Sequence, residues 1–145
     1  MSVNLYNGIY RALANDSVIL QLLKLDPLAD NITKALRIQK RAKPQNLVLG
    51  NLPLITFYTP GGRRGRENDY VFEATFVFDV YTNDDVDLAH RISQRITALF
   101  NGEILPFMGV ENFSSRLMDE HESESSLPNS YCYTTVVSMF VPLEA

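Results

Sequence analysis

The strongest pattern along the chain is an alternation of apolar and mixed side chains between residues 68 and 81. The even positions in its middle are all apolar: Phe72, Ala74, Phe76, Phe78 and Val80. Because successive side chains of a strand point to opposite faces of a sheet, this alternation predicts a strand with one buried face. At about 3.3 Å per residue the strand spans roughly 40 Å, which exceeds the usual length of about 5 to 6 residues. We therefore expect it to run through a sheet and to project beyond it.

Three other segments predict strands. Residues 53–59 and 131–143 are rich in β-branched and aromatic side chains, and residues 107–118 carry a less regular version of that pattern. Residues 60–67 combine glycines, which permit tight turns, with three arginines, and they predict the tip of a hairpin that ends in the long strand. Residues 119–126 predict an acidic, serine-rich turn in a second hairpin.

Apolar residues at helical spacing predict three helices. The first begins near Val3 and continues for about 12 residues, and Asp16 is placed to cap a short second helix. The longest helix follows residues 82–85, whose polar side chains suit a helix start, and it ends at Asn101 and Gly102. We expect its apolar stripe to lie on the apolar face of the long strand.

Residues 30–52 form a basic connection that is broken by Pro44. Ile32, Leu36 and Ile38 are compatible with a brief helix or strand, but most of the segment predicts extended or irregular chain. A connection of this length inside a compact domain is usually functional or mobile. The alternative is a solvated loop whose lysines only aid solubility.

These elements predict a single α+β domain over residues 1–145. A chain of this length can form a stable hydrophobic core without disulfides or bound metals. The fold we expect is a four-stranded, mainly antiparallel sheet made of two hairpins, with one long helix packed on one face and short N-terminal helices. The sequence shows no apolar run of about 20 residues and no export signal, so we expect neither secretion nor a membrane anchor. Cys132, the single cysteine, excludes an internal disulfide and reads as a small core residue in a reducing cytoplasm.

The net charge of -4 hides an uneven distribution of charge. Residues 31–66 contain eight lysines and arginines and no acidic residue, so this segment carries +8 and the rest of the chain carries -12. Such segregation favours contacts with nucleic acid or with acidic patches on other copies. The residues that we predict at such interfaces are Lys40, Arg41, Lys43, Arg63, Arg64, Arg66, Asp119, Glu120, Glu122 and Glu124. The alternative to an interface is an ordinary exposed loop at Arg63, Arg64 and Arg66 and a solvated turn at residues 119–124.

Catalytic motifs are scarce in this sequence. It contains no HExxH, paired-cysteine, GxSxG or Walker pattern, and the GGRRGR stretch lacks the lysine and spacing of a phosphate loop. We expect His90 and His121 to be exposed rather than catalytic. Asp84, Asp85 and Asp87 suit helix capping better than a metal site. The sequence therefore predicts neither an enzyme nor a protein with a metal or cofactor.

The order and spacing of several segments resemble a known family. An N-terminal helix is followed by a P-x-[IV]-x-[FY] strand at 53–57, a hairpin to a strand that ends in FVFDVY at 76–81, a polar break, and a helix that ends in LFNG at 99–102. Together these segments resemble the tail completion or tail terminator proteins of long-tailed bacteriophages, a head–tail joining family. The resemblance covers about residues 1–102 and the final strand, and the basic connection at 30–52 is longer than the family pattern.

The resemblance implies a virion structural protein that assembles as a ring of six copies on the head-proximal end of the tail tube. Such a ring stops tube growth and presents a surface to the head connector. The implied partners are other copies of the chain, the tail tube protein and the head–tail connector, and the implied location is the virion tail or neck after assembly in the host cytoplasm. Two alternatives remain. The chain is another head–tail connector adaptor or minor capsid protein, or it is a module that binds nucleic acid through residues 31–66.

Overall fold

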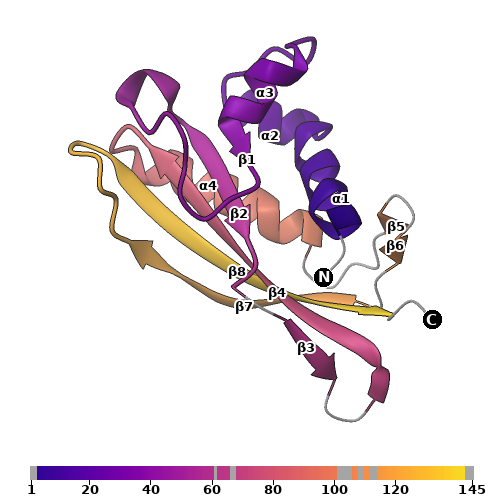
Figure 1. Ribbon diagram of the computed structural model, residues 1–145. Coiled ribbons are helices and arrows are strands. Elements are labelled where there is room, and N and C mark those ends of the chain that lie inside the picture. The colour runs from indigo at the N-terminus through magenta and orange to yellow at the C-terminus, as the bar shows by residue number, and fades with distance from the viewer. Residues whose placement is uncertain are drawn as a thin grey trace.

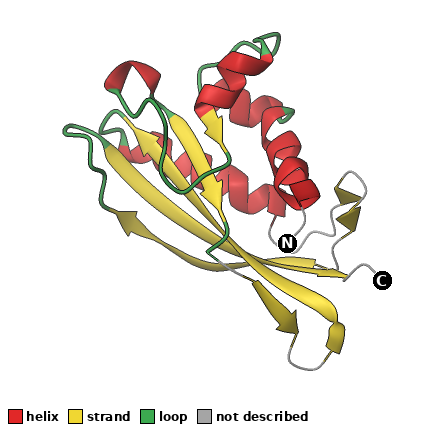
Figure 2. Ribbon diagram, in the orientation of Figure 1, coloured by secondary structure: helices red, strands yellow, loops and turns green. Residues whose placement is uncertain are grey.

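The computed structural model describes residues 3–60, 62–65, 68–100, 106–107, 110–111 and 114–142, and their side chains over 5–60, 74–100 and 116–139. In these residues the helices cover one face of a twisted β-sheet and leave the other face without a helix (Figures 1 and 2). The α+β class predicted from the sequence is confirmed.

The long strand is β4, which spans Asn68–Thr82. On one side it pairs with β8 (Tyr131–Pro142), and on the other with β2 (Leu54–Tyr58) and β3 (Gly62–Gly65), all antiparallel. The part of β4 that pairs with β3 extends beyond the helices (Figure 1). The long strand is therefore confirmed, but the expectation that it projects past the sheet is wrong, because β8 pairs with it from Val71 to Thr82 and β3 pairs with its first half.

The hairpin tip predicted at residues 60–67 is wrong in its extent. Gly62 lies opposite Ala74 and Arg63 opposite Glu73, so residues 62–65 are strand β3 rather than turn. A Gly-Arg-Arg-Gly sequence has little intrinsic preference for a strand. Its conformation instead follows from the unpaired edge that β4 offers beyond β2, a partner that sequence periodicity cannot show.

The principal sheet is larger than predicted. The described strands run in the order β1-β2-β4-β8-β7, with β3 beside β4, and β1 (Ile38–Gln39) is parallel to β2. Three of the predicted strands correspond to β2, β4 and β8, whereas the strand predicted over 107–118 is wrong in its extent, because β7 (Ser114–Ser123) begins later and a separate short strand lies at Val110–Glu111. The four-stranded antiparallel sheet becomes a larger, mixed sheet through the addition of β1 and β3. Separately, β5 (Pro106–Phe107) pairs with β6 (Val110–Glu111).

The acidic turn predicted at residues 119–126 is also wrong. Strand β7 spans Ser114–Ser123, so the first five of those residues pair with β8, and the chain turns only after them. Acidic and serine side chains disfavour strands, but an edge strand tolerates charge and even benefits from it because charge discourages aggregation. A register shift between Leu117 and Asp119 marks a bulge at this edge.

Four α-helices are described: α1 (Val3–Ala14), α2 (Ser17–Leu22), α3 (Asn31–Arg37) and α4 (Val86–Phe100). The predicted helices correspond to α1, α2 and α4. The brief helix or strand considered at Ile32, Leu36 and Ile38 is present as α3 and β1, and residues 40–48 are irregular as predicted for most of this segment. A 3-10 turn at Leu49–Asn51 follows them.

Carboxylates cap three of these helices. Asp16 accepts a hydrogen bond from the Ile19 amide at 2.9 Å, and Asp30 accepts one from Thr33 at 2.7 Å. At the start of α4, Asp85 accepts from the amide of Leu88 at 3.0 Å. The capping predicted for Asp16 and for the aspartates before α4 is confirmed at Asp16 and Asp85.

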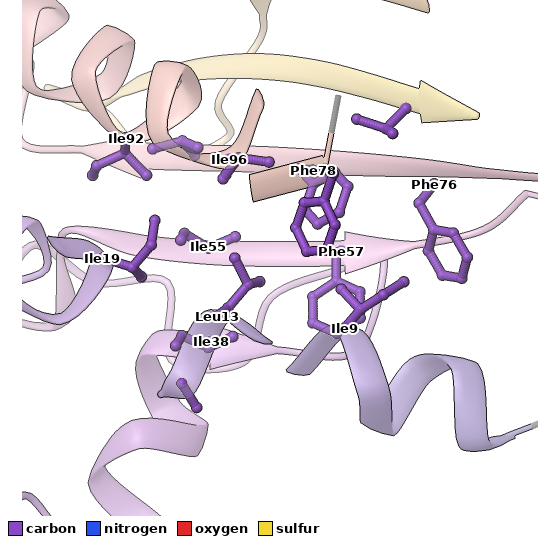
Figure 3. Packing of buried hydrophobic residues seen from close by; sticks show 14 of the residues in the cluster. Ile9, Leu13, Ile19, Ile38, Ile55, Phe57, Phe76, Phe78, Ile92 and Ile96 are labelled. Carbon is purple, nitrogen blue, oxygen red and sulfur yellow. The ribbon is translucent and has the colours of Figure 1, made fainter. Parts of the chain in front are cut away.

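The core lies between the helices and the sheet and is built around four phenylalanines (Figure 3). Phe78 of β4 stacks on Phe57 of β2 and on Phe100 of α4, with ring centroids 5.8 and 5.5 Å apart. Tyr6 of α1 meets the edge of Phe76 at 5.3 Å. The predicted packing of α4 on the apolar face of β4 is confirmed, and α1 shares that face.

The opposite face of the sheet holds a smaller cluster of buried residues. Leu52, Leu54, Tyr81 and Cys132 form it. Cys132 is 1% exposed, as predicted for a small core residue. Among the described residues, no helix is long and apolar enough to cross a membrane.

Candidate partner-binding surfaces

The basic connection between α3 and β2 is held in place by Arg37. Its Nε donates to Oδ1 of Asn51 at 3.0 Å, and its Nη1 donates to the carbonyl oxygens of Leu23 and Pro53, each at 3.2 Å. Partial burial lowers the pKa of Arg37. This cation therefore links α2, the 3-10 turn and the start of β2, and it serves the fold of the chain.

Two amide side chains complete the anchoring of this connection. Gln39, which is 5% exposed, donates to the carbonyls of Leu36 and Gln45 and accepts from the Gln45 amide, at 2.9, 2.8 and 2.7 Å. Asn51 Nδ2 donates to the carbonyls of Leu36 and Asn46 at 3.1 and 3.2 Å. Residues 40–48 have no helix or strand, yet hydrogen bonds at both ends fix their path.

Between α1, α3 and β1 lies a groove of about 690 Å³. Four cationic side chains line it, Arg11, Lys34, Lys40 and Arg41, with five carboxamides beside them. Among the described residues that line it there is no aspartate or glutamate. We call this the basic groove. Its charge suits carboxylates or phosphates, which arginine and lysine bind through charge-assisted hydrogen bonds.

Lys40 is oriented by α1. Its Nζ donates to Oδ1 of Asn7 at 2.9 Å and lies 5.6 Å from the centroid of the Tyr10 ring, a cation–π geometry. The residue is still exposed. The ammonium therefore has a defined position in the groove and can accept a further anionic partner.

The structure brings together only some of the basic residues predicted at an interface. Lys40 and Arg41 both line the basic groove, whereas Lys43 is exposed in the same connection and does not line it. Arg63 and Arg64 lie in β3, but their side chains fall outside the described residues, as does the whole of Arg66. An interface role for the three arginines stays a prediction.

Arg11 and Lys34 were missing from the predicted set. Lys34 belongs to the +8 segment, so the charge run contained a signal for it. Arg11 is an isolated cation in the last turn of α1 and joins the groove only because α1 packs beside β1. No sequence pattern indicates that contact.

The predicted acidic residues are all exposed on or beside the edge strand β7. Asp119, Glu120 and Glu122 lie within it, and Glu124 follows it directly. Glu122 accepts a hydrogen bond from the Tyr131 hydroxyl at 3.0 Å, and Asp119 Oδ2 lies 3.0 Å from Nδ1 of His121. We call these four residues the acidic edge. It stands at the opposite end of the described strand order from β1, which borders the basic groove.

The two histidines have different environments. His121 is exposed, as expected. The expectation of exposure is wrong for His90, which is half-buried because its Nε2 lies 3.1 Å from the Tyr131 hydroxyl and its ring 4.2 Å from that of Tyr133. Among the described residues, no three histidine, cysteine or acidic side chains are grouped as metal ligands would be.

A row of polar side chains crosses the sheet on the face without helices. Thr56, Asp79, Thr134 and His121 occupy neighbouring positions on β2, β4, β8 and β7. The Thr134 hydroxyl donates to Asp79 Oδ1 at 2.5 Å. Burial raises the pKa of Asp79, and the hydrogen bond from Thr134 and the nearby His121 offset part of that rise.

This row offers no activated nucleophile. Burial, followed by the charge of Asp79, raises the pKa of the neighbouring Cys132 thiol to about 12, so the thiol stays protonated at neutral pH. A thiol reacts as the thiolate, which this environment disfavours. The expectation that the chain is not an enzyme stays a prediction.

Asp79→Asn is expected to raise the free energy of unfolding at pH 7 by an amount on the order of 1 kcal/mol. Folding raises the pKa of Asp79, so the folded state favours the protonated carboxyl group. The folded protein therefore loses stability as the pH rises from the pKa of Asp79 in the unfolded chain to its higher pKa in the folded chain. Asparagine keeps an acceptor for Thr134 without the charge. Urea unfolding at pH 7 and pH 3 measures the difference, which should vanish at pH 3.

Asp79→Ala is the control for the hydrogen bond. It removes the carboxylate that accepts from the buried Thr134 hydroxyl and leaves that hydroxyl only Ser123 as a partner, so it should be less stable than Asp79→Asn at both pH values. An Asp79→Asn variant that is less stable than the natural chain at pH 7 would contradict the effect assigned to the buried charge.

The sequence matches no protein-family model and no curated protein. The fold is nevertheless shared with solved structures. One is a chain from the virion of a native gene transfer agent particle, with a TM-score of 0.66 and 13% sequence identity over 95% of this chain and 94% of that chain. Another, whose name states no function, gives a TM-score of 0.54 and 14% identity over 100% of this chain and 99% of that chain. At these identities the likeness shows a common fold.

Proposed function

We propose that this chain is a structural protein of a tailed, phage-like particle, in which it closes the head-proximal end of the tail tube and joins the tail to the head. The observation that carries the proposal is the common fold with a chain of the gene transfer agent virion. That likeness extends over nearly the full length of both chains, so the whole domain corresponds.

Three features support the finer assignment as a tail terminator. The segments at 53–57, 76–81 and 99–102 follow the order of that family. Strand β4 extends past the helices with β3 beside it, which gives each copy an arm that can reach beyond its own core (Figure 1). The basic groove and the acidic edge lie at opposite ends of the sheet order, as a head-to-tail ring requires, because each copy then uses two different surfaces.

The proposed ring contains six copies and is part of the virion neck. Its partners are the neighbouring copies, the tail tube protein on one side and the head–tail connector on the other. The chain acts by binding and capping, so its effect is stoichiometric. Assembly takes place in the host cytoplasm before the tail meets the filled head.

Deletion of the gene from the genome that encodes it tests this function. We expect negative-stain electron microscopy to show filled heads and separate tails, many of abnormal length, and expression of the natural chain in trans should restore joined particles. Tails of normal length that still fail to join would instead favour a connector adaptor. Normal, infectious particles would contradict a structural role in joining.

A nucleic-acid-binding module is the second candidate, and the basic groove is the observation that favours it. Affinity for a DNA duplex that falls steeply with salt concentration would support this function. The net charge of -4 opposes it, because the rest of the chain repels a polyanion.

A further inference from the structure

The surface around α3 is left uncovered by the rest of the chain. No side chain of α3 is buried. Ile32, on its first turn, is 76% exposed, although isoleucine is among the residue types most often found inside proteins. One side of this helix, with Lys34, borders the basic groove. Arg37 at its end holds this helix to the rest of the chain, and its exposed side is open to a partner.

The acidic edge offers matching properties. Within the part of the chain that the structure describes, β7 pairs on one side only, with β8. Its four carboxylates fall within six positions, 119–124, and Met118 at the bulge is 52% exposed. The edge thus combines negative charge with an apolar side chain, and the exposed Ile32 lies on α3, the helix that borders the positively charged groove, outside the lining of the groove.

We propose that the acidic edge of one copy binds in the basic groove of a second copy, so that β7 of each chain meets α1, α3 and β1 of the next. The two surfaces lie at opposite ends of the strand order, so the contact cannot close on itself in a symmetric pair and instead repeats from copy to copy. This contact rests on the proposed ring and specifies which surfaces build it. The charges set the register of neighbours, and Met118 and Ile32 supply apolar contact area.

A pair of complementary variants provides the test. The groove variant carries Lys34→Glu and Arg41→Glu, and the edge variant carries Glu120→Lys and Glu124→Lys. The control variant carries Lys24→Glu and Arg91→Glu, which change the net charge as the groove variant does but at exposed positions outside the groove. Circular dichroism and thermal unfolding establish that all of them fold.

The first readout is zero-length carbodiimide crosslinking of the natural chain, with equal amounts of isotope-labelled and unlabelled protein. We expect mass spectrometry to find labelled-to-unlabelled amide bonds that join Lys34 or Lys40 to carboxylates of the acidic edge. The crosslinks from Lys40 to Asp119 or Glu122, whose reactive groups are kept in every variant, should persist in the control variant and fall at least about tenfold in each reversed variant. They should also weaken as ionic strength rises from about 0.01 M to about 1 M. Absence of intermolecular crosslinks in the natural chain would overturn the proposal.

The second readout uses the head-to-tail geometry. In a mixture, the acidic edge of the groove variant meets the natural groove of the edge variant, and the reversed edge of the edge variant meets the reversed groove of the groove variant, so both contacts pair opposite charges. We expect native mass spectrometry to show that each variant alone fails to associate, whereas the mixture forms oligomers in which the two variants alternate. A chain carrying all four reversals should associate again, because its charges are complementary once more. Failure of that chain to associate, with folding intact, would count against the contact.

Other outcomes separate this contact from the proposed function. If the groove variant loses affinity for a DNA duplex while crosslinks between copies are unaffected, the groove binds nucleic acid and the proposal is wrong. If crosslinks and variants behave as expected but gene deletion leaves normal particles, the contact stands and the tail role fails. If gene deletion gives abnormal tails but substitution of these four residues changes neither crosslinking nor particle assembly, the tail role is supported and the proposed contact is wrong.

Discussion

Phe78→Ala is expected to lower the free energy of unfolding by about 3–5 kcal/mol, the usual cost of removing a buried phenylalanine ring. Phe78 has no exposed surface and lies at the centre of the core, where its ring stacks on Phe57 and Phe100. Alanine removes the stacking of this ring on β2 and on α4 at once. Since small domains are stable by only about 5–15 kcal/mol, this variant should be close to the limit of folding.

Urea unfolding followed by circular dichroism measures that loss. The expected fall in melting temperature is roughly 10–15 °C for a domain of this size. Phe78→Leu is the matched control, because it keeps most of the volume and should cost less than half as much. A second control, Val86→Ala at a position 42% exposed, should change stability by less than about 0.5 kcal/mol. A Phe78→Ala variant as stable as the Val86→Ala variant would contradict the central place of this ring.

Sequence periodicity was a reliable guide where a long element buries one face. The alternation around Phe76 and Phe78 and the helical stripe of α4 both predicted the correct element and the correct partner, because burial of a regular face leaves a regular pattern. Short elements left only an ambiguous pattern. Ile32, Leu36 and Ile38 were compatible with a helix or a strand, and because β1 has two residues and α3 buries no side chain, neither repeats long enough to decide between the two.

Strand pairing accounts for the errors at β3 and β7. Both segments are poor in strand-forming residues, and both are strands because a longer neighbour, β4 or β8, presents an open edge to them. Preferences of individual residues for strands are weak and depend on context. The composition of these two segments therefore predicted turns, although pairing with a neighbouring strand makes both of them β-strands.

The candidate interface was predictable in charge but only partly in position. The +8 segment indicated three of the four cations in the basic groove, and Arg11 came from a distant helix. Arg37 shows the limit of charge counting, because it belongs to the same segment yet hydrogen-bonds backbone carbonyls inside the fold. Residue type cannot separate a cation that binds a partner from one that supports a loop.

Asp16→Ala is expected to cost about 2–4 kcal/mol, because one carboxylate makes two kinds of contact. It caps α2 through the Ile19 amide, and it binds Arg95 of α4 by two hydrogen bonds, at 2.9 and 2.6 Å. A lost cap costs about 1 kcal/mol, and hydrogen bonds to charged groups contribute about 1.5–3 kcal/mol. The Asp16 side chain is only 11% exposed, so solvent replaces these partners poorly.

Asp16→Asn separates the two contributions. Asparagine caps a helix about as well as aspartate, so this variant should lose only the charge-dependent part. The hydrogen bond from Arg95 holds the pKa of Asp16 below its ordinary value of 3.8, so the stability from the ion pair is present above that pH and is lost as pH falls through the folded pKa. The advantage of the natural chain over Asp16→Asn should therefore be constant near neutral pH and disappear in strong acid. In a double-mutant cycle, Arg95→Ala should cost much less in the Asp16→Ala background than alone, and additive effects would show that the two side chains act independently.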